Sequence, residues 1–212
     1  MIGAARAISI ALAIGFSTPA TAQTDVFLFY GAGPHAFSTG IDTIARWARH
    51  VRGVTVHGPY DYRETQRAYD EARHAPGHIV LAGYSCGSAS SLTVAAALPR
   101  PVTVAVMQPS QWCGRYPATA NTTLLQNTYS YGTWGFGSYT PEGPAGHIVN
   151  INRHNAHLQG DNDRDSQRDV LAAIAATSNQ GPRSRQWYWN RLHRTTSYGY
   201  TRGNTTWLEG RD

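Results

Sequence analysis

The stretch Gly83-Tyr84-Ser85-Cys86-Gly87 follows the pattern G-x-S-x-G and decides the fold that we expect. The run before it, residues 78–82, is short, apolar and typical of a strand, and residues 88–98 after it are rich in Ala and Leu and typical of a helix. A serine on a sharp strand-to-helix turn presents its hydroxyl above the sheet, and the two glycines let the backbone turn without a clash. The pattern predicts a nucleophilic serine at position 85, whereas the simpler alternative is a glycine-rich turn with an uninvolved serine.

Strand and helix patterns alternate along the chain on both sides of this motif. Strands are predicted at residues 25–30, 53–56, 78–82, 101–107 and 146–151, with 122–129 as a further candidate, and helices at 40–51, 61–73, 88–98 and 165–177. This alternation predicts an α/β fold, with a mainly parallel sheet and helices on both of its faces. Ligands of such sheets bind at the carboxyl ends of the strands, where Ser85 is expected to lie.

The first 22 residues have the features of a signal peptide. Arg6 supplies the positive charge, residues 7–16 are apolar, and Ala20-Thr21-Ala22 matches a cleavage site. The apolar stretch is too short to span a bilayer. We therefore expect an exported protein, periplasmic or secreted, whose mature chain starts near Gln23.

The remaining chain has the length of one domain and a short extension. Residues 23–181 carry the alternating pattern, whereas residues 182–212 are rich in arginine and aromatic residues and show no clear periodicity. The formal net charge is +5, and all 18 basic residues are arginine. Six arginines fall between positions 183 and 211, which predicts either a peripheral contact with an anionic membrane or envelope surface or a solvated tail. No nucleic-acid-binding motif accompanies them, so we expect no nucleic-acid partner.

A serine hydroxyl needs a base to take its proton. In a fold of this kind the base is a histidine in the loop after the last strand, here residues 152–161. That loop contains His154 and His157, and position alone does not choose between them.

An attacked carbonyl also needs backbone N–H groups to stabilise its negative oxygen. One should come from Cys86, the residue after the nucleophile, and the other from the loop after the first strand. Since Pro34 has no N–H, Ala32 or Gly33 is the expected second donor.

The chain has two cysteines, Cys86 and Cys113. Export would place them in an oxidising compartment, and neighbouring strands of one sheet could bring them together. A disulfide beside the active site is therefore predicted, with two separate buried thiols as the alternative. The cysteines lack suitably spaced partners for a metal site, so we expect neither metal nor cofactor.

Four segments occur in an order and spacing that resemble a known superfamily. They are Tyr30-Gly31-Ala32-Gly33, Phe37-Ser38-Thr39-Gly40-Ile41-Asp42, the Ser85 motif, and His157-Leu158 with Asp161. Together, over about residues 25 to 177, they resemble small bacterial proteins of the alpha/beta-hydrolase superfamily, of the lipase- and thioesterase-like kind. The resemblance implies a serine ester hydrolase acting on a small-molecule or lipid ester, with Ser85 as nucleophile and His157 as the favoured base.

The chain departs from this pattern at the acid that normally orients the histidine. Gln108 stands where an aspartate is expected, and the one acid between Ser85 and His157 is Glu142. Three hypotheses follow: Glu142 completes a triad, Gln108 orients the imidazole of a Ser–His dyad, or the protein is a catalytically degenerate hydrolase with a binding or cell-envelope role. Asp161 and Asp163 are expected to cap the final helix.

Overall fold

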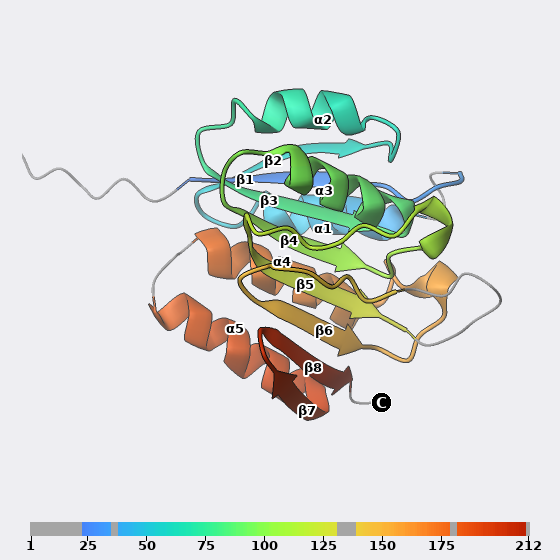
Figure 1. Cartoon of the computed structure of the whole chain (residues 1–212), viewed down its shortest axis with the longest axis vertical. Coiled ribbons are helices and arrows are strands. Elements are labelled where there is room, and N and C mark those ends of the chain that lie inside the picture. The colour runs from blue at the N-terminus through green and yellow to red at the C-terminus, as the bar shows by residue number, and fades with distance from the viewer. Residues whose placement is uncertain (1–22, 35–37, 131–138, 179–181, 211–212) are drawn as a thin grey trace, which may run out of the picture.

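The computed structural model describes residues 23–34, 38–130, 139–178 and 182–210, so the predicted signal peptide lies outside the described residues. Eight strands form one sheet in the order β2-β1-β3-β4-β5-β6-β8-β7 (Figure 1). All neighbouring strands are parallel except β7, which runs antiparallel to β8. The strand bounds are β1 Thr24–Phe29, β2 Val54–Tyr60, β3 His78–Tyr84, β4 Val102–Met107, β5 Thr122–Tyr129, β6 Ile148–Asn152, β7 Thr196–Arg202 and β8 Thr205–Gly210.

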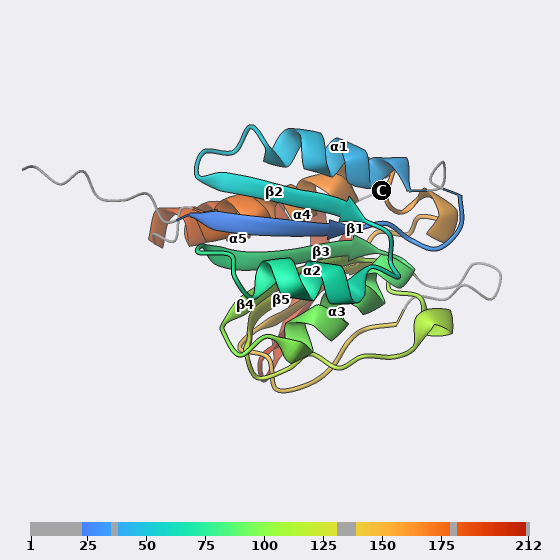
Figure 2. The same cartoon turned by 90° about the horizontal axis from the view of Figure 1, so that it is seen from above.

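Helices cover both faces of the sheet, as the sequence predicts (Figure 2). The helices α1 (Thr39–Ala48), α4 (Arg164–Ser178) and α5 (Pro182–Thr195) lie on one face. On the other face lie α2 (Thr65–Ala72) and α3 (Cys86–Ala97). Short 3-10 helices, η2 (Gln111–Cys113) and η3 (His157–Gln159), follow β4 and β6.

The strands are apolar on both faces because both faces are covered. In β1, Val26 and Leu28 pack toward α1 and α4, whereas Phe27 and Phe29 pack toward α2 and α3. This arrangement forms two cores separated by the sheet. The mainly parallel, two-sided α/β fold is confirmed.

The C-terminal residues are part of this fold rather than an addition to it. Residues 182–210 form α5 and the β7–β8 hairpin, and β8 pairs with β6 in the sheet. Tyr188, Leu192 and Leu208 are buried in the core with α4. The boundary predicted at residue 181 therefore does not mark the edge of the packed core.

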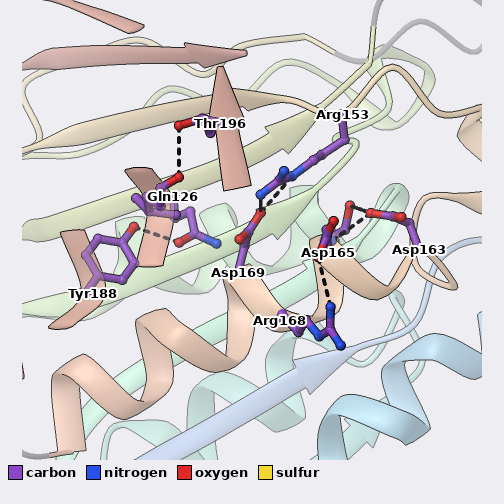
Figure 3. Close-up of polar contacts among 10 residues, drawn as sticks. Gln126, Arg153, Asp163, Asp165, Arg168, Asp169, Tyr188 and Thr196 are labelled. Carbon is purple, nitrogen blue, oxygen red and sulfur yellow. Dashed lines mark hydrogen bonds and ion pairs between the residues drawn. The ribbon is translucent and has the colours of Figure 1, made fainter. Parts of the chain in front are cut away.

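Buried polar contacts attach these C-terminal elements to the sheet (Figure 3). The Tyr188 hydroxyl donates a hydrogen bond of 2.7 Å to Gln126 Oε1 on β5. The Thr196 hydroxyl donates to the carbonyl of Leu192, which joins the end of α5 to β7. Tyr188 therefore packs inside the protein. None of the helices in the described part of the chain combines the length and apolarity needed to cross a membrane.

Candidate active site

Ser85 lies at the junction of β3 and α3, at the carboxyl end of the strand. Its backbone has φ 53° and ψ −117°, a conformation that residues other than glycine rarely adopt. The neighbouring Ser88 stabilises this turn, because its hydroxyl lies 3.0 Å from the Gly83 carbonyl and 3.1 Å from the Met107 carbonyl. The local sequence thus folds into the strained strand–turn–helix that the motif predicts.

The two glycines of the motif are required by close packing. A Cβ on Gly83 would lie 2.2 Å from the carbonyl oxygen of Gly87. A Cβ on Gly87 would lie 2.5 Å from the carbonyl oxygens of Phe29 and Tyr30 on the neighbouring strand. A side chain at either position would push α3 away from the sheet and displace Ser85.

The structure places His157, and not His154, against the serine. Ser85 Oγ lies 3.0 Å from His157 Nε2, across 72 residues of sequence. His154 points elsewhere, since its Nε2 lies 3.1 Å from Glu209 Oε2 and its side chain is half exposed.

Tyr84 holds the histidine in place, a role that the sequence analysis missed. Its hydroxyl donates a hydrogen bond to the carbonyl of His157, and the two rings stack with centroids 5.5 Å apart. The variable second position of the G-x-S-x-G pattern carries no signal for this contact.

A buried ion pair anchors the start of the histidine loop. Arg153 directly follows β6, and its Nε donates a hydrogen bond of 2.9 Å to Asp169 Oδ2 on α4 (Figure 3). Both side chains are almost inaccessible to solvent. The loop that leads to His157 is therefore fixed to a helix in the core.

Burial lowers the pKa of the His157 imidazole below its ordinary value of 6.5. The cause is desolvation, which penalises the charged ring. A ring with a lowered pKa is neutral at neutral pH, and a neutral imidazole is the form that accepts a proton.

Ser85 opens into a pocket of about 270 Å³. Its lining consists mainly of aromatic, apolar and disulfide groups: Ala32, Tyr62, Tyr84, Ser85, Cys86, Ser110, Trp112, Cys113, His157 and Leu158. Trp112 and Leu158 are 69% and 59% exposed, so they form an apolar rim that the sequence analysis did not identify.

The structure brings two of the three predicted oxyanion donors to this pocket. Cys86 is the first residue of α3, and the N–H groups of a first helical turn have no partner within the helix. Ala32 lines the same pocket, whereas Gly33 lines a neighbouring one with Tyr30 and Pro59.

The predicted disulfide between Cys86 and Cys113 is present, with their Cα atoms 5.3 Å apart. It connects the start of α3 to η2 and forms part of the pocket wall. A disulfide next to the serine fits an exported protein.

The two candidates for the third catalytic position, Glu142 and Gln108, lie in different parts of the structure. Glu142 is exposed and lines a different pocket with Arg115. Gln108 is fully buried, and its amide donates a hydrogen bond to Asn155 Oδ1. Gln108 also packs against Gly160, so it touches the histidine loop at two places.

The two aspartates after His157 cap different helices. Asp161 Oδ2 accepts a hydrogen bond of 2.8 Å from the N–H of Gly40, so it caps α1 rather than the final helix. Burial raises the pKa of Asp161 to about 6. Asp163 caps α4, the helix predicted at residues 165–177, as expected, because its Oδ2 accepts from the N–H of Ser166 at 2.7 Å. Among the described residues, no group of three or more His, Cys, Asp or Glu side chains is placed to hold a metal ion.

A mainly parallel sheet, covered on both faces and carrying a serine elbow with a histidine from the loop after β6, defines an alpha/beta-hydrolase fold. Comparison with solved structures agrees. A chain from Xanthomonas campestris pv. campestris, described as a candidate hydrolase of the alpha/beta superfamily, matches with a TM-score of 0.50 and 20% sequence identity. The match covers 72% of this chain and 96% of that one, and at this identity the likeness concerns the fold. No protein-family model and no curated protein matches the sequence.

Proposed function

We propose that this protein is an exported serine hydrolase that cleaves an ester or thioester through an acyl-enzyme on Ser85. The observation that carries the proposal is the 3.0 Å approach of Ser85 Oγ to His157 Nε2 at a strained strand-to-helix turn. Strain of this kind persists where the surroundings enforce it, and it is common at catalytic nucleophiles. The disulfide next to the serine supports action outside the cytoplasm, in the periplasm or after secretion.

In the proposed reaction, Ser85 Oγ attacks the carbonyl carbon while His157 Nε2 takes the hydroxyl proton. The N–H groups of Cys86 and Ala32 stabilise the negative oxygen. When the carbonyl re-forms, the bond to the leaving alcohol or thiol breaks, and His157 gives that group its proton. Water then attacks the acyl-enzyme by the same route and releases the acid.

The pocket around Ser85 suits a short acyl group. Its volume of about 270 Å³ is below the usual range of about 300–1,000 Å³ for sites that bind drug-sized ligands. The exposed Trp112 and Leu158 would contact the acyl chain at the rim. We therefore expect the rate to fall as the acyl chain grows.

A nitrophenyl ester series tests the proposal, with acyl chains from acetyl to decanoyl. Ser85→Ala and His157→Ala should each lower kcat by at least about 10³-fold, because each removes a group that acts in the transition state. Ser90→Ala is the matched control, since Ser90 lies on the same helix and its hydroxyl donates to the Tyr62 carbonyl. Turnover that Ser85→Ala leaves unchanged would overturn the assignment of Ser85 as nucleophile. Absence of turnover by the folded wild type would overturn the hydrolase and favour the degenerate, binding role.

A further inference from the structure

A second pocket, of about 540 Å³, lies beside the Ser85 pocket. Gln111 lines the second pocket, whereas its chain neighbours Ser110 and Trp112 line the first. The Ser110 N–H also lies 3.5 Å from the Ser85 carbonyl oxygen. The segment from Ser110 to Trp112 therefore contributes to the walls of both pockets.

The second pocket is lined by residues from the segments after β4 and β5, from the end of β5 and from β8. In Figure 1, α2 and α3 lie over the half of the sheet that contains β1 to β4. The described segments after β4 and β5 cross the same face near β4 and β5. Tyr129 at the end of β5 and Trp207 on β8 line the pocket, and their rings meet edge to face.

The lining of the second pocket differs in chemistry from that of the first. Aromatic rings alternate with groups that donate or accept hydrogen bonds: Gln111, Arg115, Tyr116, Pro117, Tyr129, Tyr139, Thr140, Pro141, Glu142 and Trp207. The polar groups are already organised, since Arg115 Nη2 donates 2.9 Å to Gln111 Oε1 and the Tyr116 N–H donates 3.0 Å to the Tyr139 hydroxyl.

This chemistry selects one class of ligand. Among the described residues that line the pocket, one is an arginine and one a glutamate, so these carry no excess charge for a phosphate or a carboxylate. Mixed donors and acceptors suit hydroxyl groups, which both donate and accept. Aromatic side chains suit the C–H face of a sugar ring, because an aromatic ring presents a flat apolar surface on which that face can pack.

We propose that the second pocket binds the alcohol part of the substrate, and that this alcohol is a neutral sugar. The inference rests on the proposed function, because it assigns the acyl group to the Ser85 pocket and the leaving group to the second pocket. The substrate class is then an O-acylated saccharide with a short acyl chain. The ester bond breaks at Ser85, and the sugar leaves with its hydroxyl restored.

The test compares acetate release from three esters: an O-acetylated hexose oligosaccharide, octyl acetate and methyl acetate. The wild type should prefer the sugar ester over octyl acetate by at least about tenfold in kcat/KM. Arg115→Gln and Tyr116→Ala should lower kcat/KM for the sugar ester by about tenfold, mainly through KM, because they remove binding and not chemistry. The same variants should change methyl acetate hydrolysis by less than about twofold, because a methyl group is too small to reach the second pocket. Trp47→Ala, an exposed aromatic residue on α1, is the matched control.

A direct binding measurement separates failure of this inference from failure of the proposed function. Saturation-transfer NMR on the Ser85→Ala protein should detect the unacetylated oligosaccharide, and Tyr116→Ala in that background should abolish the signal. Absence of binding to Ser85→Ala, or loss of activity on all three esters alike in Arg115→Gln, would overturn the sugar pocket even if Ser85 is a working nucleophile. Binding without any turnover by the wild type would instead overturn the hydrolase and keep the pocket.

Discussion

At the residue scale, the chemistry depends on a serine after β3 and a histidine after β6, which are 72 residues apart in the sequence. The motif identifies Ser85 because its glycines and its strand–helix context are local. His157 is harder to predict, since the choice between two histidines depends on how the loop after β6 turns. That turn is fixed by Tyr84 and by the Arg153–Asp169 pair, both of which are tertiary contacts.

The lowered pKa of His157 predicts the pH dependence of hydrolysis. The neutral imidazole is the active base, so kcat/KM should rise with pH through the pKa of His157 in the free enzyme and then level off. Since burial lowers this pKa, the midpoint of the rise should lie below 6.5. A pH–rate profile with nitrophenyl acetate measures it. A midpoint clearly above 6.5 would contradict the assignment of His157 as a desolvated base.

Glu142 offers a second test at this scale, because it was a candidate for the triad acid and lies in the second pocket. Glu142→Gln should keep kcat for nitrophenyl acetate within about threefold of wild type, whereas loss of a triad carboxylate costs about 10⁴-fold on the serine protease template. Glu64→Gln is a matched control, since Glu64 is a partly exposed carboxylate that pairs with Arg67. A fall of 10³-fold or more would return Glu142 to the triad.

At the element scale, the helix caps show where sequence reasoning reaches its limit. Asp163 is three residues from the N–H that it caps, so a local pattern predicts the contact. Asp161 caps α1 at Gly40, 121 residues away, and no local pattern encodes that contact. The sequence therefore predicts that both aspartates cap a helix, but it identifies the correct helix only for Asp163.

Loss of the Asp161 cap should destabilise the fold. Asp161→Ala leaves the buried Gly40 N–H without its acceptor, which should lower the free energy of unfolding by about 1–3 kcal/mol. Asp161→Asn should cost less, because it keeps an acceptor oxygen and removes a carboxyl group whose charge burial disfavours. Urea denaturation measures both. An equal loss of unfolding free energy in the two variants would contradict the capping role.

The disulfide connects two elements that flank the serine, and the sequence predicted it correctly. Its two cysteines are separated by 27 residues, a loop for which the chain-entropy account gives about 3.5 kcal/mol of stabilisation. Cys113→Ser should lower the free energy of unfolding by roughly this amount. A reductant should shift the urea midpoint of the wild type toward that of the variant and leave the variant itself unchanged. A wild-type midpoint that is insensitive to a reductant which opens the bond would contradict this role.

At the scale of the whole molecule, the alternation of strands and helices in the sequence predicts the fold class. The same alternation does not predict the C-terminal elements. The hairpin turn at Gly203-Asn204 is a recognisable signal between β7 and β8. The C-terminal elements are nevertheless easily missed, because the sequence of α5 mixes arginines with aromatic residues and so obscures the apolar face of the helix. Only packing against α4 and β5 shows that Tyr188 and Leu192 belong to the core.

A core position on α5 tests whether the C-terminal elements stabilise the whole molecule. Leu192 is fully buried, so Leu192→Ala should lower the free energy of unfolding by about 2–5 kcal/mol. Gln186→Ala, at an exposed position of the same helix, should change it by less than about 0.5 kcal/mol. Thermal or urea unfolding followed by circular dichroism gives both values. Similar stability in the two variants would mean that α5 is a dispensable extension.

The central claim is that Ser85 is an activated nucleophile, and a fluorophosphonate probe tests it most directly. The folded wild type should gain one probe adduct, located on Ser85 by peptide mass spectrometry, and the labelling rate should rise with pH as His157 loses its proton. Ser90→Ala should be labelled normally, His157→Ala far more slowly, and Ser85→Ala not at all. Folded wild-type protein that stays unlabelled between pH 6 and pH 9, or that is labelled at another residue, would contradict the account.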